Sequence, residues 1–105
     1  MTKKDVRLTQ FEIDAIVSSF YEFFKPEDNI WLFGSRADTS KRGGDIDLYI
    51  KTSIKDYSEA FYKKRDFSIK LQDIIGEQKI DIVLDLGTQE LPIYQIAKTT
   101  GVKLS

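Results

Sequence analysis

The fold is decided by two stretches of sequence, Trp31-Leu-Phe-Gly-Ser-Arg36 and Asp45-Ile-Asp-Leu-Tyr-Ile50. The first carries a short apolar run, residues 30–33, into a Gly-Ser pair, which predicts a buried strand that stops in an open turn. The second alternates strictly, so it predicts a strand with Asp45 and Asp47 on one face and apolar residues on the other. Two strands joined by a polar loop therefore form the centre of the predicted fold.

The flanking segments predict three helices and a third strand. Thr9 and Glu12 form a capping box, which begins a helix over residues 8–24. A long helix is expected over residues 56–76, a strand over 79–86 and a last helix over 91–101, while residues 102–104 form either an edge strand or an ordered tail. This order predicts an α+β fold, a two-layer arrangement of a small mixed sheet with helices packed on one face.

Two further interpretations concern the helix over residues 56–76 and the loop over 35–44. The inward positions of the helix are expected to be Phe61, Phe67, Leu71, Ile74 and Ile75. Its basic run, residues 63–65, is interpreted as a solvated face. The charged loop residues 41 and 42 are likewise interpreted as solvated, and the strand residue at position 31 as part of the core.

Length and charge limit the class of protein. A chain of 105 residues makes one domain, residues 1–105, and its 41% hydrophobic and 31% charged residues are typical of a globular chain. A formal charge of −1 gives no general attraction to nucleic acid or to an anionic membrane. The polar start of the chain and the lack of a bilayer-length apolar run predict a cytoplasmic protein that does not span a membrane.

The chain contains no Cys and no His. Thiolate zinc sites, disulfides, cysteine nucleophiles and imidazole acid–base chemistry are therefore excluded. Carboxylates, Lys, Arg, hydroxyls and backbone amides remain. This set of groups suits hard cations such as Mg²⁺ and phosphate ligands.

Four aspartates are candidates for such chemistry. Asp45 and Asp47 project side by side, an unfavourable arrangement unless they are solvated, paired or bridged by a cation. Asp81 and Asp85 share one face of the later strand, and a third carboxylate beside the pair would suffice to hold two Mg²⁺ ions about 3.5–4 Å apart. The alternative is that these aspartates are exposed strand residues that hydrogen-bond nearby loops.

The turn at Gly34-Ser35 favours the first interpretation. Its backbone amides and hydroxyl are suited to phosphate oxygens, and Arg36 could neutralise phosphate charge. Together with Asp45-x-Asp47, this Gly-Ser-Arg sequence resembles the signature of DNA polymerase beta-type nucleotidyltransferases. The chain is especially similar to the minimal nucleotidyltransferases, and the resemblance spans residues 8–104.

The resemblance implies a nucleotidyltransferase fold and assigns a role to each part of the motif. Gly34 and Ser35 would contact the triphosphate, Asp45 and Asp47 would ligate both metal ions, and Asp81 would ligate the catalytic metal and help to activate the acceptor hydroxyl. Asp81 is preferred to Asp85 because Asp85 lies at the far end of its strand. Gly44 stands where relatives often have Ser before the first aspartate, a departure that removes no ligand.

The same resemblance implies an enzyme that uses Mg²⁺ and transfers AMP from ATP to a hydroxyl with release of pyrophosphate. Relatives of this kind resemble antitoxins of two-gene modules whose other half is a HEPN-type helical ribonuclease, and some adenylylate a tyrosine of that toxin. A domain of this size has no second lobe to hold an acceptor, so a HEPN-type toxin partner is expected, with self-association as a homodimer a further route.

Two alternatives remain open from the sequence. The chain could neutralise its partner by binding alone, without turnover. It could instead transfer a nucleotide to a small hydroxyl compound, although larger enzymes of that kind add a substrate-binding domain. Template-directed DNA synthesis is disfavoured because there are no further domains to hold a template.

Overall fold

A computed structural model describes residues 6–37 and 44–105 of the chain. Its elements follow in the order α1 (Gln10–Phe23), β1 (Asn29–Phe33), η1 (Gly34–Ala37), β2 (Ile46–Lys51), α2 (Tyr57–Ile75), β3 (Ile80–Asp85), α3 (Pro92–Thr100) and β4 (Val102–Lys103). The predicted helices and strands are all present, and the C-terminal segment forms an edge strand. The loop residues 41 and 42, interpreted above as solvated, lie outside the described residues.

Local sequence determines where the helices begin and end. The Thr9 hydroxyl accepts the Glu12 amide at 3.1 Å, and the Glu12 carboxylate accepts the Thr9 amide at 2.9 Å, so the predicted capping box is confirmed. The Asp56 carboxylate caps α2 by accepting the Ser58 amide at 3.0 Å. α2 ends at Gly76, whose φ of +90° favours glycine.

The strands form one mixed sheet in the order β3-β2-β1-β4. β1 runs antiparallel to both β2 and β4, whereas β2 and β3 are parallel. α2 makes the crossover that a parallel pair requires. The register places Asp47 opposite Phe33 on one side and opposite Asp81 on the other.

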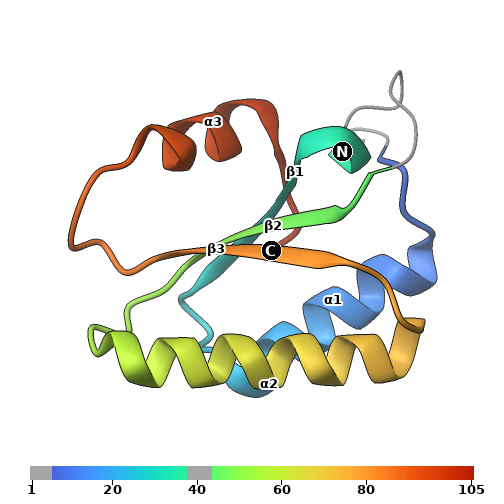
Figure 1. The fold of residues 1–105 in the computed structure, drawn as a ribbon, viewed down its shortest axis with the longest axis horizontal. Helices are drawn as coiled ribbons and strands as arrows, with labels where there is room; N and C mark the ends of the chain where they lie inside the picture. The colour runs from blue at the N-terminus through green and yellow to red at the C-terminus, as the bar shows by residue number, and fades with distance from the viewer. Residues whose placement is uncertain (1–5, 38–43) are drawn as a thin grey trace.

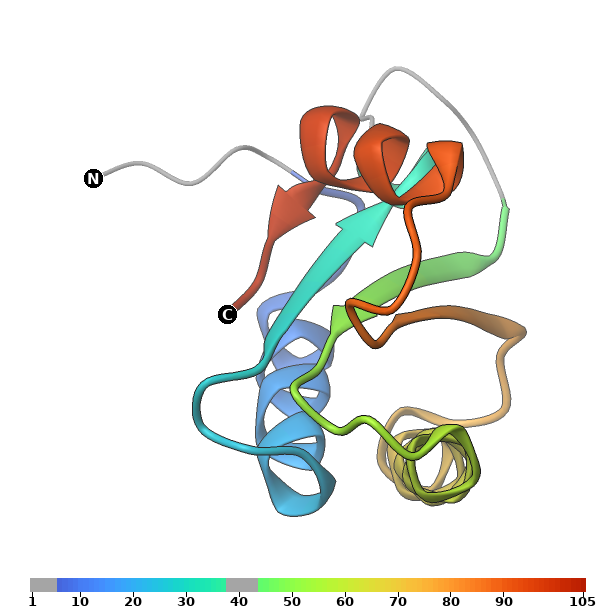
Figure 2. The ribbon, with the colours of Figure 1, turned by 90° about the vertical axis from the view of Figure 1, so that its left-hand side faces the viewer.

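Helices cover both faces of the sheet (Figure 1). α1 and α2 lie on one face, where the main core contains Ile16, Phe20, Leu48 and Phe67. α3 lies on the opposite face, as Figure 2 shows from the side. The predicted mixed α+β architecture is therefore confirmed. The prediction that the helices pack on one face holds for α1 and α2, whereas α3 packs on the other face.

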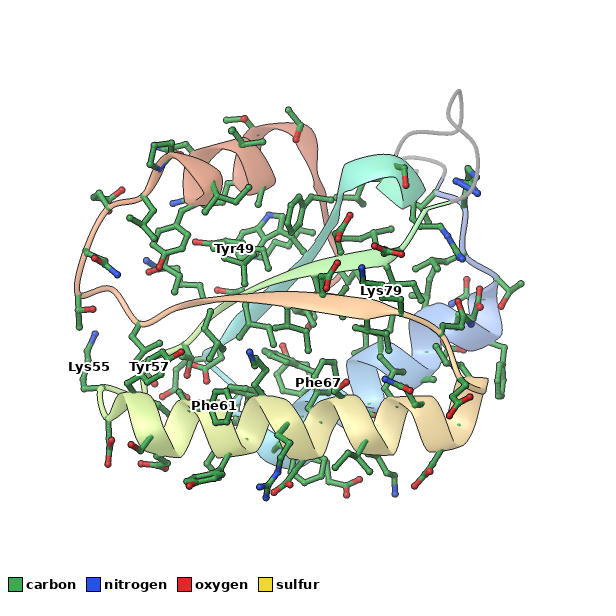
Figure 3. All side chains as sticks on the ribbon, viewed as in Figure 1. Tyr49, Lys55, Tyr57, Phe61, Phe67 and Lys79 are labelled. Carbon is green, nitrogen blue, oxygen red and sulfur yellow. The ribbon has the colours of Figure 1, made fainter. Side chains whose placement is uncertain are left out.

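α3 covers the other face because that face is only partly acidic. Tyr49 of β2 is fully buried there and packs against Tyr94 of α3, with ring centroids 5.7 Å apart, and against Trp31 of β1 at 5.1 Å. Figure 3 shows Tyr49 on the α3 side of the sheet and Phe67 on the α2 side. The apolar end of the face is thus closed by α3, and the aspartates occupy the other end.

The buried stripe of α2 differs in part from the prediction. Phe67 and Leu71 are buried as expected, together with Ala60. Phe61 and Ile74 are instead 39% and 36% exposed. Residues 60, 67 and 71 form the stripe of α2 that faces the sheet, and Phe61 and Ile74 lie to the side of this stripe.

Across residues 6–37 and 44–105, no helix is long and apolar enough to span a membrane.

Candidate active site

The two halves of the sequence motif meet where β1 ends and β2 begins. Gly34 follows directly after β1 and adopts a φ of +76°. A side chain at this position would strike the Asp47 carboxylate, whose Oδ2 is the nearest atom to the place a Cβ would occupy. Only glycine therefore combines this backbone conformation with the close approach to Asp47.

A second close approach joins the other members of the motif. Gly44 has a φ of +88°, and a Cβ there would collide with the hydroxyl oxygen of Ser35. A serine at this position would need the Ser35 side chain to move. Gly44 thus allows the Ser35 side chain to lie close to the backbone just before β2.

Asp47 lies among like charges. Asp81 is its partner in the parallel register, and Asp45 precedes it by two residues on the same strand face. Burial raises the pKa of Asp47 above its ordinary value, and the charges of Asp81 and Asp45 raise that pKa further. Bringing positive charge to this place would relieve the repulsion, which Lys79 counteracts in part.

The oxygen-only donor set at this end of the strands suits Mg²⁺, which prefers carboxylate ligands. Asp45, Asp47 and Asp81 are the side chains that could hold such an ion. Within the described part of the chain, however, no three acidic side chains are gathered tightly enough to form a complete metal cage. Asp45 forms an ion pair with Lys79, with its Oδ2 3.6 Å from Lys79 Nζ.

Arg36 faces away from the carboxylates. Its guanidinium donates to the carbonyl of Arg7 and to Oε1 of Gln78, both at 3.3 Å, while its own carbonyl accepts the Arg7 amide at 2.8 Å. Its buried Nε finds no hydrogen-bond partner among the described residues. Arg36 therefore fixes η1 to the segment before α1 and to the turn before β3.

Asp85 lies at the other end of β3 and does not join the acidic group. Its carboxylate accepts the Tyr49 hydroxyl at 2.5 Å and the Gly87 amide at 2.9 Å, and it is only 3% exposed. Lys51, its partner in the register, lies 4.0 Å away. The structure thus brings Asp81, and not Asp85, beside Asp47.

Comparison with known proteins agrees with this geometry. The family described as polymerase beta, nucleotidyltransferase matches residues 9–104. The chain belongs to this nucleotidyltransferase family. The expectation drawn from the Gly-Ser-Arg and Asp-x-Asp sequences is confirmed at this level.

The nucleotidyltransferase fold is also found in a solved structure. A crystal structure of a mutant toxin–antitoxin complex, MntA-HpeT, contains a chain that matches with a TM-score of 0.65 and 21% identity, covering 89% of this chain and 72% of that one. No curated protein is similar enough to match. At this identity the likeness shows a common fold.

The sequence motifs of this nucleotidyltransferase do not include one residue of the site, Lys79. It directly precedes β3, at the opposite end of the strand pair from Lys55 (Figure 3). Besides binding Asp45, its charge counteracts the rise in the pKa of Asp47. The signal was present in the sequence, since Lys79 precedes Asp81 by two residues and so shares its strand face.

Proposed function

We propose that this nucleotidyltransferase transfers AMP from ATP to a tyrosine hydroxyl of a HEPN-type partner toxin and acts as the antitoxin of that protein. The observation that carries the catalytic part is the meeting of Gly34, Asp47 and Asp81 at the ends of three neighbouring strands. The family match supports nucleotidyl transfer. The fold shared with the MntA-HpeT toxin–antitoxin complex supports a toxin as partner.

Each residue has a distinct task in the proposed reaction. The Gly34-Ser35 turn binds the triphosphate through backbone amides and the Ser35 hydroxyl. Asp45, Asp47 and Asp81 would hold two Mg²⁺ ions, which supply neutralisation of the triphosphate charge when bound. Lys79 releases Asp45 for this purpose and turns its own charge toward phosphate. Arg36 keeps η1 in place.

The chemical step is a displacement at the α phosphorus. The tyrosine oxygen forms a bond to this phosphorus, while the bond from the phosphorus to the oxygen that bridges to the β phosphate breaks. Pyrophosphate leaves with the bonding electron pair, and the hydroxyl proton passes to the Asp81 carboxylate. The Asp81 carboxylate can take up this proton because β3 is at the edge of the sheet, where the acceptor hydroxyl can approach.

The proposal is tested by incubating the purified chain with Mg²⁺, ATP and the purified HEPN-type toxin of the proposed two-gene module. Label in the α phosphate should appear on a toxin tyrosine, whereas label in the γ phosphate should not, and mass spectrometry should find one or more added AMP groups. Asp45→Asn and Asp47→Asn should abolish the labelling. Asp73→Asn, on the exposed side of α2, is the matched control and should label at the wild-type rate.

The alternative of neutralisation by binding alone gives a different result. In that case the toxin stays unlabelled, its toxicity is still suppressed, and Asp47→Asn suppresses as well as wild type. That combination would overturn the proposed reaction. Labelling of an added small hydroxyl compound in place of the toxin would overturn the proposed acceptor and keep the nucleotidyl transfer.

A further inference from the structure

β3 is an edge strand. Among residues 6–37 and 44–105 it pairs with β2 alone, at one end of the sheet order. At the two ends of the β2–β3 pair, the Ile46 amide donates to the Lys79 carbonyl and the Thr52 amide donates to the Asp85 carbonyl. In a parallel pair with this pattern, the odd-numbered residues of β3 bond to β2. The backbone groups of Ile80, Ile82 and Leu84 therefore point outward. An open edge of this length is suited to pairing with another chain.

A groove of about 410 Å³ runs between this edge and α2. The α2 wall carries Phe61 and Ile69, which are 39% and 55% exposed, and two cations, Lys64 and Arg65. Figure 3 shows Phe61 on the part of α2 that lies under β3. Aromatic, aliphatic and Arg side chains around an open strand are the composition found at the centres of protein interfaces.

The groove and the candidate active site share Asp81, whose carboxylate lies on the face of the sheet opposite α2. Asp81 belongs both to the groove lining and to the carboxylate group around Asp47. A strand added to β3 would lie about 4.8 Å away, with every second side chain on the same face as the Asp81 carboxylate. A side chain placed opposite Asp81 in that way brings a hydroxyl to the reacting group.

The charges of the groove indicate what kind of segment fits. Lys64 lies 5.0 Å from the centre of the Phe61 ring, so its charge is held over the apolar part of the groove. Arg65 lies 5.0 Å from the Tyr62 ring and also binds Asp66 at 3.2 Å. Acidic side chains of a bound segment would complement these cations. A second copy paired through β3 would instead bring the two basic α2 walls toward each other, which is unfavourable.

We propose that the β3 edge and the α2 groove bind an extended, acidic segment of the partner protein as an added strand, and that this segment carries the acceptor hydroxyl. This inference rests on the proposed function for the acceptor, but the docking itself can be measured without transfer. Backbone hydrogen bonds to Ile80, Ile82 and Leu84 would supply affinity. Pairing of acidic residues with Lys64 would supply selectivity.

Docking is tested with a displayed library of eight-residue peptides that have a fixed central tyrosine, selected on the chain in EDTA and without ATP. The enriched peptides should be rich in Asp and Glu, and their binding should protect the amides of Ile80, Ile82 and Leu84 from hydrogen exchange. Lack of enrichment, enrichment of basic peptides, or protection confined to other elements would overturn the inference.

Two pairs of variants test the same surface. Ile82→Pro removes an outward amide without breaking the β2 ladder, and Ile82→Ala removes a similar part of the side chain while keeping the amide. Peptide affinity should fall about tenfold or more in Ile82→Pro relative to Ile82→Ala. Lys64→Glu should weaken binding about threefold to tenfold relative to Lys63→Glu, whose position lies outside the groove lining. Equal affinities within both pairs would overturn the inference, and the second pair remains decisive if the proline variant does not fold.

Failure of this inference is distinguishable from failure of the proposed function. If the toxin is adenylylated equally well by Ile82→Pro and Ile82→Ala, the docking surface is wrong and the reaction stands. If peptides bind at β3 but remain unlabelled when Mg²⁺ and ATP are added, and the toxin is also unlabelled, the surface stands and the reaction falls.

Discussion

The two ends of the β2–β3 pair carry the same type of residue in opposite circumstances. At one end Asp81 lies opposite Asp47, and at the other Asp85 lies opposite Lys51. Asp81 and Asp85 are four residues apart on one face of one strand, so a strand pattern alone treats them alike. Their surroundings separate them.

The Asp85 end is closed. The carboxylate accepts two hydrogen bonds and lies near a cation, and α3 covers this end through Tyr49 and Tyr94. Burial raises the pKa of the Tyr49 hydroxyl, and its hydrogen bond to Asp85 raises it further, so the tyrosine stays a donor. A buried carboxylate satisfied in this way stabilises the fold.

The Asp47–Asp81 end is open, and its charges repel each other. An arrangement of like charges that the described residues neutralise only in part indicates a ligand-binding function. The contrast shows that the partners of a strand aspartate decide whether it serves stability or catalysis. Substitutions at the open end should therefore lower the reaction rate, and substitutions at the closed end should lower stability.

The largest expected effect is on the reaction rate at the open end. Asp81→Asn removes the proton acceptor and one metal ligand, so AMP transfer should fall by about a thousandfold. The free energy of unfolding should change by no more than about 0.5 kcal/mol, because the side chain is exposed. Initial rates with α-labelled ATP and urea unfolding measure both quantities. A loss of stability comparable to that of a core substitution would contradict the separation of the two ends.

Gly34→Ala should act on the same end through position. The added methyl group displaces the Asp47 carboxylate, and a shift of about 1 Å in a reacting group lowers rates about a hundredfold. Gly76→Ala is the matched control, because Gly76 also has positive φ but has no atom within 4 Å of the added methyl group. Both variants should lose about 1 kcal/mol of stability. Only the first should lose activity, and equal activities would show that Asp47 is not held at Gly34.

The sequence predicts the open end well because its signals are local. Alternation with period two places Asp45 and Asp47 on one face, and the Gly-Ser turn directly follows a short apolar run. These patterns require no knowledge of distant contacts. The family resemblance then supplied the third carboxylate.

The pairing of strands could not be predicted in the same way. Asp81 lies opposite Asp47 because Ile80 pairs with Ile46, and alternation within each strand does not say which residue of one strand pairs with which residue of the other. The placement of α3 on the other face has the same origin, since it depends on the patch formed by Tyr49 and Trp31 from two different strands. Contacts between distant segments decided both.

At the closed end the expected effect is on stability. Asp85→Asn replaces one acceptor oxygen with an amide donor, so either the Tyr49 hydroxyl proton or the Gly87 amide loses its acceptor. The free energy of unfolding should fall by about 2 kcal/mol, which lowers the Tm by about 8–16 °C in a domain of this size. Calorimetry checks this value. Rates measured well below the Tm should stay near wild type, and a loss as large as that of Asp81→Asn would contradict the assignment.

The smallest expected effect is a gain in stability, and it depends on pH. Burial and the charges of Asp81 and Asp45 raise the pKa of Asp47 in the folded chain above the 3.8 of an unperturbed carboxyl group. The folded state therefore holds this proton more tightly than the unfolded state, and stability is lost as the pH rises through the folded pKa. Asp47→Asn removes this loss, so in EDTA at pH 7 it should be more stable than wild type by up to about 1 kcal/mol.

The pH dependence identifies the cause of this gain. The advantage of Asp47→Asn should disappear below pH 3.8, where Asp47 is protonated in both folded and unfolded wild type. Asp73→Asn provides the control, since that exposed carboxylate lies away from the acidic group. A gain that persisted unchanged in acid would have to come from packing and not from charge. A gain confined to neutral pH, together with a loss of AMP transfer, would show that the open end retains a destabilising charge because the reaction uses it.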